Sequence, residues 1–204
     1  MGIYNRLIIP RLIDLAMRND QLTGYRKEVI QQARGAVLEI GVGSGVNLPL
    51  YGEPISSVIA VDPSAELLQL ATSRASTALV PVSLVQASAE QLSFADAAFD
   101  TVVMTWTLCS IPNPVVALRE VRRVLKPEGR LAFVEHGLSP QPGVVRWQRW
   151  LTPFWCRMSG GCHLDRDMEQ LIRAAGFQIG SLDTGYMKGP KPWTYMYQGS
   201  AMTH

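Results

Sequence analysis

The stretch that decides the fold is L-E-I-G-V-G-S-G, Leu38 to Gly45. It completes a short apolar run, Ala36 to Ile40, of the kind that forms a strand buried on both faces of a sheet. The glycines Gly41, Gly43 and Gly45 allow a tight turn, and they let a ligand approach the backbone N–H groups at the start of the next element. The sequence therefore predicts a strand that leads directly into a ligand-binding turn.

The glycine spacing and two acidic residues indicate which ligand the turn would bind. The spacing is G-x-G-x-G, whereas G-x-G-x-x-G is typical of a pyrophosphate on a helix N-terminus. Glu39, in the strand, would repel a pyrophosphate and attract a cationic group. Asp62 ends the run V-I-A-V-D about 20 residues beyond the loop, where an acid accepts hydrogen bonds from both ribose hydroxyls. Loop and acids together predict a nucleoside with a short, partly cationic tail.

Short apolar runs alternate with helical patterns along most of the chain. We expect strands near residues 36–40, 58–61, 81–86, 99–105 and 129–136, and helices near 21–34, 64–77 and 113–125. Such alternation implies right-handed crossovers and a mostly parallel sheet, so the predicted class is α/β, doubly wound. After residue 136 we expect an irregular or helical insertion at 137–164, a helix near 165–175, and an antiparallel pair of strands at 177–182 and 193–199.

Length and composition limit the domain count and the partners. A chain of 204 residues fits one sizeable domain. The net charge of only +2 disfavours a nucleic acid as the main ligand, because such binding needs a broad basic surface. Three irregularly spaced cysteines do not make a disulfide framework, so a reducing, cytoplasmic setting fits best. The oligomeric state is left open between monomer and homodimer.

The N-terminal residues 1–34 are expected to form a helical cap on a domain of residues 35–204. Charged residues and Pro10 interrupt the apolar run at its start, so neither a membrane-spanning helix nor a signal peptide is predicted. We expect this segment to pack on the domain or to cover a pocket. Peripheral contact with a membrane surface is the alternative.

Four segments carry a resemblance to a known family: E-I-G-V-G-S-G, V-D-P-S, A-S-A-E-Q-L-S-F-A-D-A-A-F-D and E-V-R-R-V-L-K-P-E-G-R-L. Together they resemble the class I S-adenosylmethionine-dependent methyltransferases of the ubiquinone/menaquinone methyltransferase-like branch, over residues 25–136. The resemblance implies a Rossmann-like, seven-stranded, mostly parallel sheet with an antiparallel last strand. It also implies S-adenosyl-L-methionine as the cofactor and S-adenosyl-L-homocysteine as its product.

The resemblance further implies where the cofactor binds. Glu39 and Gly41 would lie near its methionine end, Asp62 would bind the ribose, and Thr105 would lie beneath the cofactor at the end of a strand. The full set of expected cofactor-binding residues is Glu39, Gly41, Gly43, Gly45, Asp62, Pro63, Ser88, Ala89, Glu90 and Thr105.

The adenine end departs from the family pattern at one position. Ala89 and Glu90 would flank the adenine, but the position two residues before this pair, often acidic in the family, is Ala87 here. We therefore expect the adenine to contact backbone N–H groups and the hydroxyl of Ser88.

The methyl acceptor is expected beyond the carboxyl ends of the strands, where open α/β sheets bind ligands. Methyl transfer from a sulfonium is an in-line displacement, so the protein mainly has to align the acceptor and exclude water. His136 is the candidate general base or hydrogen-bond partner, because an imidazole titrates near neutral pH. A histidine that only bonds the chain leaving the strand is the alternative.

The later part of the chain carries a narrower resemblance. L-C-S-I-P-N-P, F-V-E-H and W-Q-R-W-L-T-P-F-W-C-R-M-S-G-G-C-H-L-D-R-D resemble the subgroup that includes the animal microsomal thiol methyltransferases. This resemblance implies a small lipophilic thiol or sulfide as acceptor. A free thiol has a pKa of about 8.5, so one weak base would suffice to activate it. The expected acceptor-pocket residues are Trp106, Cys109, Trp147, Trp150, Phe154, Trp155 and His163.

Other functions stay open. A phospholipid amine or a quinone ring carbon could be the acceptor instead, and a nucleoside-binding module without catalysis is the non-enzymatic alternative. Cys156 and Cys162 have five residues between them, outside the spacing of about two to four that is usual in structural zinc sites. We therefore expect no metal, and packing roles for both cysteines. Cys109 is expected to be a small buried residue and not a nucleophile.

Overall fold

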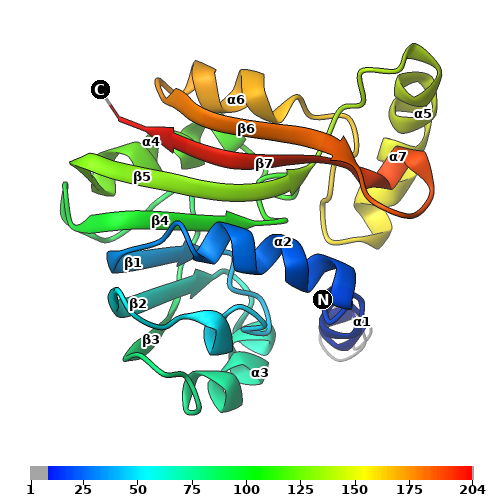
Figure 1. The fold of residues 1–204 in the computed structure, drawn as a ribbon. Helices are drawn as coiled ribbons and strands as arrows, with labels where there is room; N and C mark the ends of the chain where they lie inside the picture. The colour runs from blue at the N-terminus through cyan, green and yellow to red at the C-terminus, as the bar shows by residue number, and fades with distance from the viewer. Residues whose placement is uncertain (1–8, 204) are drawn as a thin grey trace.

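The protein, described here by a computed structural model over residues 9–203, is built on one seven-stranded sheet (Figure 1). The strand order is β3-β2-β1-β4-β5-β7-β6. Strands β1 to β5 run parallel, and β7 is antiparallel to both of its neighbours, β5 and β6. The predicted α/β class with an antiparallel last strand is confirmed. The strands are β1 (Gly35–Ile40), β2 (Ile55–Asp62), β3 (Val82–Gln86), β4 (Phe99–Thr105), β5 (Leu125–His136), β6 (Gln178–Tyr186) and β7 (Tyr195–Met202).

Helices precede, connect and follow the strands. They are α1 (Ile9–Met17), α2 (Asp20–Ile30), the 3-10 turn η2 (Leu48–Leu50), α3 (Ala65–Ala75), α4 (Pro114–Val124), α5 (Pro142–Met158), α6 (Met168–Ala174) and α7 (Lys191–Thr194). The predicted insertion is thus mostly one long helix, α5. The proposed division at residue 34 stays a prediction, and the part of the cap at residues 1–8 lies outside the described residues.

Several helix starts follow from the sequence. Ser64 caps α3 by accepting a hydrogen bond from the Leu67 N–H at 3.2 Å, and Asp167 caps α6 in the same way. Asp167 is also why α6 begins at Met168, later than the sequence pattern predicted. Proline at the first position opens α4 and α5, where it costs no intrahelical hydrogen bond.

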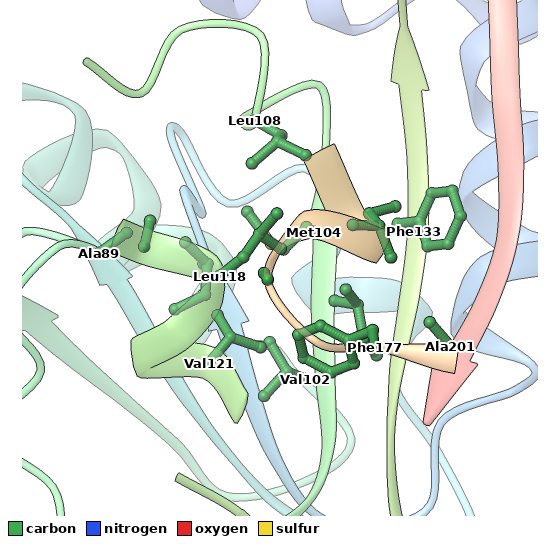
Figure 2. Close-up of a cluster of buried hydrophobic side chains, with 14 of the residues drawn as sticks. Ala89, Val102, Met104, Leu108, Leu118, Val121, Phe133, Phe177 and Ala201 are labelled. Atoms are coloured by element: carbon green, nitrogen blue, oxygen red, sulfur yellow. The ribbon is translucent and has the colours of Figure 1, made fainter. Parts of the chain in front are cut away.

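The core lies on both faces of the sheet, because successive strand residues point to opposite sides. Val102 and Met104 of β4 pack with α4 and α6 on one face, whereas Val103 packs with α2 and α3 on the other. Figure 2 shows Met104 and Phe133 gathered with Leu118 of α4 on the first face. Burying each such side chain stabilises the fold by about 1.5–3 kcal/mol.

The sheet brings the predicted site segments to one edge. The carboxyl ends of β1, β2, β4 and β5 lie at the side of the sheet where α1, α5 and α7 are found (Figure 1). The glycine loop, Asp62, the turn after β4 and His136 all follow directly from these strand ends. In the described part of the chain, every helix is too short or too polar to cross a membrane.

Candidate active site

A cavity of about 580 Å³ lies at the carboxyl ends of the parallel strands, a volume typical of small-molecule sites. Most of the predicted cofactor residues line it. They are Gly41, Gly43, Asp62, Pro63, Ser88, Ala89, Glu90 and Thr105. Ala16 and Met17 at the end of α1 also line the cavity, so this helix contributes to the cavity wall.

The glycine loop needs its glycines for different reasons. Gly41 has φ +70°, and a Cβ there would lie 2.2 Å from the Thr107 Oγ1. Gly43 has φ +55°, and a Cβ there would meet no atom within 4 Å, so only its backbone conformation requires glycine. Gly45 does not line the cavity: it packs against Leu48 and Ala71, which corrects its predicted role as a cofactor contact.

Asp62 is held in place by backbone donors. Its Oδ2 accepts a hydrogen bond from the Gly43 N–H at 2.9 Å, and its Oδ1 accepts one from the Ser64 N–H at 2.9 Å. Burial raises the pKa of this carboxyl, and the two N–H donors oppose that rise. Each oxygen keeps a lone pair for a further donor, so the carboxylate is ready to accept from two neighbouring hydroxyls.

Glu39 lies one layer behind the cavity. Its side chain is buried and absent from the cavity wall, and its Oε1 accepts a hydrogen bond from the Asn47 Nδ2 at 2.8 Å. Burial raises the pKa of Glu39 to about 7. Glu39 is thus absent from the cavity wall, and its predicted role in binding the cofactor stays a prediction. Asn47, which the sequence did not single out, lines the wall in front of it.

Arg26 of α2 is a cavity residue that the sequence gave no reason to choose. Its Nη1 donates to the Asn47 Oδ1 at 2.9 Å and to the Thr105 Oγ1 at 3.2 Å. Its guanidinium carbon lies 4.6 Å from the centre of the Trp106 ring, a cation–π contact. Burial lowers the pKa of Arg26 to about 10, so the group stays charged at neutral pH. Arg26 therefore places a fixed positive charge beside the glycine loop.

Glu135 holds the turn that follows β4. Its Oε1 accepts from the N–H groups of Thr107 at 2.7 Å and Leu108 at 2.8 Å, and its Oε2 accepts from that of Cys109 at 3.4 Å. Burial raises the pKa of Glu135 to about 7, against the effect of these donors. Trp106, at the start of the turn, has φ +50°, an uncommon backbone conformation for a bulky residue. The turn is thus fixed by a carboxylate that belongs to the neighbouring strand.

The far end of the cavity brings together three segments that are distant in the sequence. The Nε2 of His136 lies 3.0 Å from the Sγ of Cys162. Cys109, His136 and Cys162 all line the cavity, and one ligand atom from each lies within 4.8 Å of the others. Hydrogen bonding with Cys109 and then with His136 lowers the pKa of the Cys162 thiol, against the effect of burial. Cys156 lies outside this wall, and its Sγ donates to the carbonyl of Cys162 at 3.0 Å.

Helix α5 is attached through one face, and the predicted aromatic wall is mostly on the other. Val144, Gln148 and Thr152 point inward at helical spacing, and the Gln148 amide donates to the carbonyls of Gly137 and Pro192. Trp155 does line the cavity, with its ring centre 5.5 Å from that of Trp193 of α7.

Three predicted pocket aromatics therefore need correction. Trp147, Trp150 and Phe154 are 59%, 71% and 65% exposed on the outer face of α5, away from the cavity. Trp147 and Trp150 line a separate surface hollow. His163 is also outside the cavity wall, with its Nδ1 4.0 Å from Asp165. Among the predicted acceptor-pocket residues, those at the cavity are Trp106, Cys109 and Trp155.

The fold and site together define a class of protein. The sheet is open, a glycine turn follows β1, and an acid suited to a ribose ends β2 beside the cavity at the strand ends. This is the arrangement of a class I S-adenosylmethionine-dependent methyltransferase. A methyltransferase domain model matches residues 38–133.

Proteins of known sequence agree with this class. The chain is 38% identical to rat (Rattus norvegicus) thiol S-methyltransferase TMT1B over 145 residues, which are 69% of this chain and 59% of the relative. It is 32% identical to human (Homo sapiens) TMT1B over 171 residues, 78% of this chain and 70% of the relative. A phosphatidylethanolamine N-methyltransferase from Cereibacter sphaeroides is 38% identical over 104 residues, 50% of this chain and 51% of the relative.

Solved structures share the fold. One is an S-adenosylmethionine-dependent methyltransferase from Aquifex aeolicus, with a TM-score of 0.68 and 20% identity, covering 96% of this chain and 98% of that one. Another is the N-methyltransferase NodS from Bradyrhizobium japonicum WM9 in complex with S-adenosyl-L-homocysteine, with a TM-score of 0.67 and 15% identity, covering 91% and 88%. The chain belongs to the S-adenosylmethionine-dependent methyltransferase family that includes the TMT1B thiol S-methyltransferases.

Proposed function

We propose that the protein transfers the methyl group of S-adenosyl-L-methionine to the sulfur of a small lipophilic thiol. The observation that carries this proposal is a single cavity with a polar, nucleoside-type end at Asp62 and an apolar, sulfur-rich end at His136. The likeness to thiol S-methyltransferases supports the same acceptor class.

The cofactor would bind along the strand ends. Its ribose hydroxyls would donate to Asp62, and its adenine would lie beside Ser88, Ala89 and Glu90, in the predicted positions. Its methionine carboxylate would meet the positive charge of Arg26. This orientation would direct the sulfonium methyl group toward the turn that Glu135 holds.

The methyl transfer itself needs alignment more than strong acid or base catalysis. Bound S-adenosyl-L-methionine would supply the methyl group for an in-line attack by the acceptor sulfur, and the thiol would lose its proton at the end of the cavity where His136 lies. Trp155 and Trp193 would hold the apolar part of the acceptor and exclude water.

The cavity wall favours a thiol over a phospholipid headgroup. Among the described residues that line the cavity, Arg26 is the sole lysine or arginine, and it lies at the glycine loop. A phosphate-bearing acceptor would need a cation near the other end, because phosphate recognition relies on arginine, lysine or helix N-termini. An uncharged lipophilic thiol has no such need.

The test is a panel of acceptors with one labelled cofactor. Purified protein would be incubated with methyl-labelled S-adenosyl-L-methionine and an alkyl thiol, phosphatidylethanolamine or a demethylquinone, and the products identified by mass spectrometry. We expect a labelled methyl thioether, with Leu79→Ala as a surface control that retains activity. Labelled lipid or quinone without any thioether would contradict the proposal. Binding of S-adenosyl-L-homocysteine without any methylated product would instead indicate a nucleoside-binding module.

We also propose that the outer face of α5 contacts a membrane surface, from which a lipophilic acceptor would reach the cavity. Trp147, Trp150 and Phe154 are exposed side by side on a helix that also carries Arg146, Arg149 and Arg157 and has no acidic residue. Exposed tryptophan beside basic residues is the pattern of helices that lie in the interface of an anionic bilayer.

Cosedimentation with vesicles tests this contact. We expect binding to vesicles of phosphatidylcholine with phosphatidylserine, weakened by Trp147→Ala with Trp150→Ala. Leu79→Ala, which removes an even more exposed apolar side chain elsewhere, should leave binding unchanged. Equal binding by all variants would contradict the proposal. A dimer of the free protein that the two tryptophan substitutions dissociate would assign this face to a second copy of the chain.

A further inference from the structure

The cluster of Cys109, His136 and Cys162 has the composition of a metal site, although the sequence spacing does not suggest one. Its members come from the turn after β4, the end of β5 and the loop after α5. Sequence spacing drew attention to Cys156 and Cys162, but the Sγ of Cys156 donates to the carbonyl of Cys162 and is not one of the three grouped ligand atoms. The fold replaces it with Cys109 and His136, which are 53 and 26 residues from Cys162 in the sequence.

We propose that Cys109, His136 and Cys162 bind a Zn²⁺ ion whose fourth coordination position faces the cavity. Two thiolates and one imidazole are a donor set that zinc prefers, and three protein ligands with one open position are typical of catalytic zinc. Zinc–sulfur bonds of about 2.3 Å and zinc–nitrogen bonds of about 2.0–2.1 Å place tetrahedral ligands roughly 3.4–3.8 Å apart. The three donor atoms already lie within 4.8 Å of one another, so a contraction of about 1 Å would complete the site.

The backbones that carry the ligands are tied together independently of any ion. Glu135, next to His136, holds the turn of Cys109 through three N–H groups. The N–H of His163, next to Cys162, donates to the carbonyl of Cys109 at 2.9 Å. Arg166 donates to the carbonyl of Ile111 at 2.8 Å and to that of Leu108, which fixes the same turn from the other side. Hydrogen bonds around the ligands, such as these, orient metal-binding side chains.

The inference deepens the proposed function and rests on it. An acceptor thiol that takes the fourth position would lose its proton to solvent and stay bound as a thiolate, the nucleophilic form of sulfur. The thiolate would attack the methyl carbon of the sulfonium, the carbon–sulfur bond to the cofactor would break, and S-adenosyl-L-homocysteine would remain. The neutral thioether product is a weaker ligand and would leave. His136 would then serve as a ligand in place of the predicted general base.

Metal analysis tests the site without relying on activity. The full chain would be purified without a chelator or a metal-affinity tag and analysed by mass spectrometry for zinc. We expect about one zinc per chain. After chelator treatment, added Co²⁺ should give the charge-transfer absorption of a cobalt–thiolate bond, and zinc should abolish it. Cys109→Ser, Cys162→Ser and His136→Ala should each weaken Co²⁺ binding at least tenfold.

Cys156→Ser is the matched control, because it removes a neighbouring thiol outside the cluster, and it should bind Co²⁺ like the unmodified protein. Binding of S-adenosyl-L-homocysteine by each variant checks that it is folded. No zinc and no cobalt–thiolate absorption in the unmodified protein would overturn the inference, as would equal binding by all variants. Methylation of a thiol by the metal-free protein would also overturn it while leaving the proposed function in place, with His136 acting as a free imidazole.

Discussion

Replacing Glu39 with glutamine should change how stability depends on pH. Burial raises the pKa of Glu39 from 4.5 to about 7 in the folded protein. A carboxyl group with a raised pKa stabilises the fold fully only below its unfolded pKa, and this contribution is lost as pH rises through the folded pKa. At about 1.4 kcal/mol per pKa unit, the rise corresponds to about 3 kcal/mol.

The difference between the two proteins isolates this effect, because their other ionisable groups are the same. Urea unfolding of the unmodified protein and of Glu39→Gln would be measured from about pH 4 to pH 8. Relative to the variant, the unmodified protein should lose about 3 kcal/mol of unfolding free energy across that range. Glutamine keeps a carbonyl oxygen for the Asn47 amide, so the variant should fold. Parallel stability curves would show that Glu39 is not buried as an ionisable group, and would refute the reasoning.

Three further predictions concern the cavity. Asp62→Asn should weaken S-adenosyl-L-homocysteine binding about 10- to 100-fold by calorimetry, because a charge-assisted hydrogen bond contributes about 1.5–3 kcal/mol; an unchanged affinity would place the ribose elsewhere. Arg26→Met should weaken binding of S-adenosyl-L-homocysteine at least tenfold more than binding of adenosine, because adenosine lacks the methionine moiety that Arg26 would contact. Equal losses of affinity for the two ligands would mean that Arg26 only supports the fold. Trp155→Ala should raise the KM for the thiol several-fold and leave the KM for the cofactor unchanged in steady-state assays; the reverse pattern would assign Trp155 to the cofactor.

Local patterns predicted the fold well. The strand expected at 99–105 coincides with β4, and the other parallel strands lie within a few residues of their expected places. These strands are buried on both faces, so their apolar runs are nearly continuous and easy to recognise. The glycine loop and Asp62 were equally easy to recognise, because each lies at the end of a single strand, β1 for the loop and β2 for Asp62.

The site was harder to predict where it depends on distant contacts. Trp147, Trp150 and Phe154 are aromatic residues in a pocket-forming region, but the inward face of α5 is set by Gln148 and its bonds to two distant carbonyls. Arg26 is one basic residue on an ordinary helix, and only its contacts in the folded protein, with Asn47, Thr105 and Trp106, mark it. Neither feature has a local sequence signal.

Cysteine spacing did not reveal the cluster at the far end of the cavity. In the sequence, Cys156 invites comparison with Cys162 because they are close in the chain, and a packing role is expected for Cys109 as well. The sheet instead places the turn after β4 beside the end of β5, which brings Cys109 toward His136 and Cys162. Clusters of this kind arise from strand order, which a single sequence does not reveal.

The most direct test of the account is the fate of the labelled methyl group. The protein would be given methyl-labelled S-adenosyl-L-methionine and a lipophilic alkyl thiol, and the products would be separated and identified by mass spectrometry. We expect the label on the thiol sulfur as a methyl thioether, with one S-adenosyl-L-homocysteine formed for each thioether. A label that stays on the cofactor, or that appears on a lipid amine or a quinone ring while the thiol is unchanged, would contradict it.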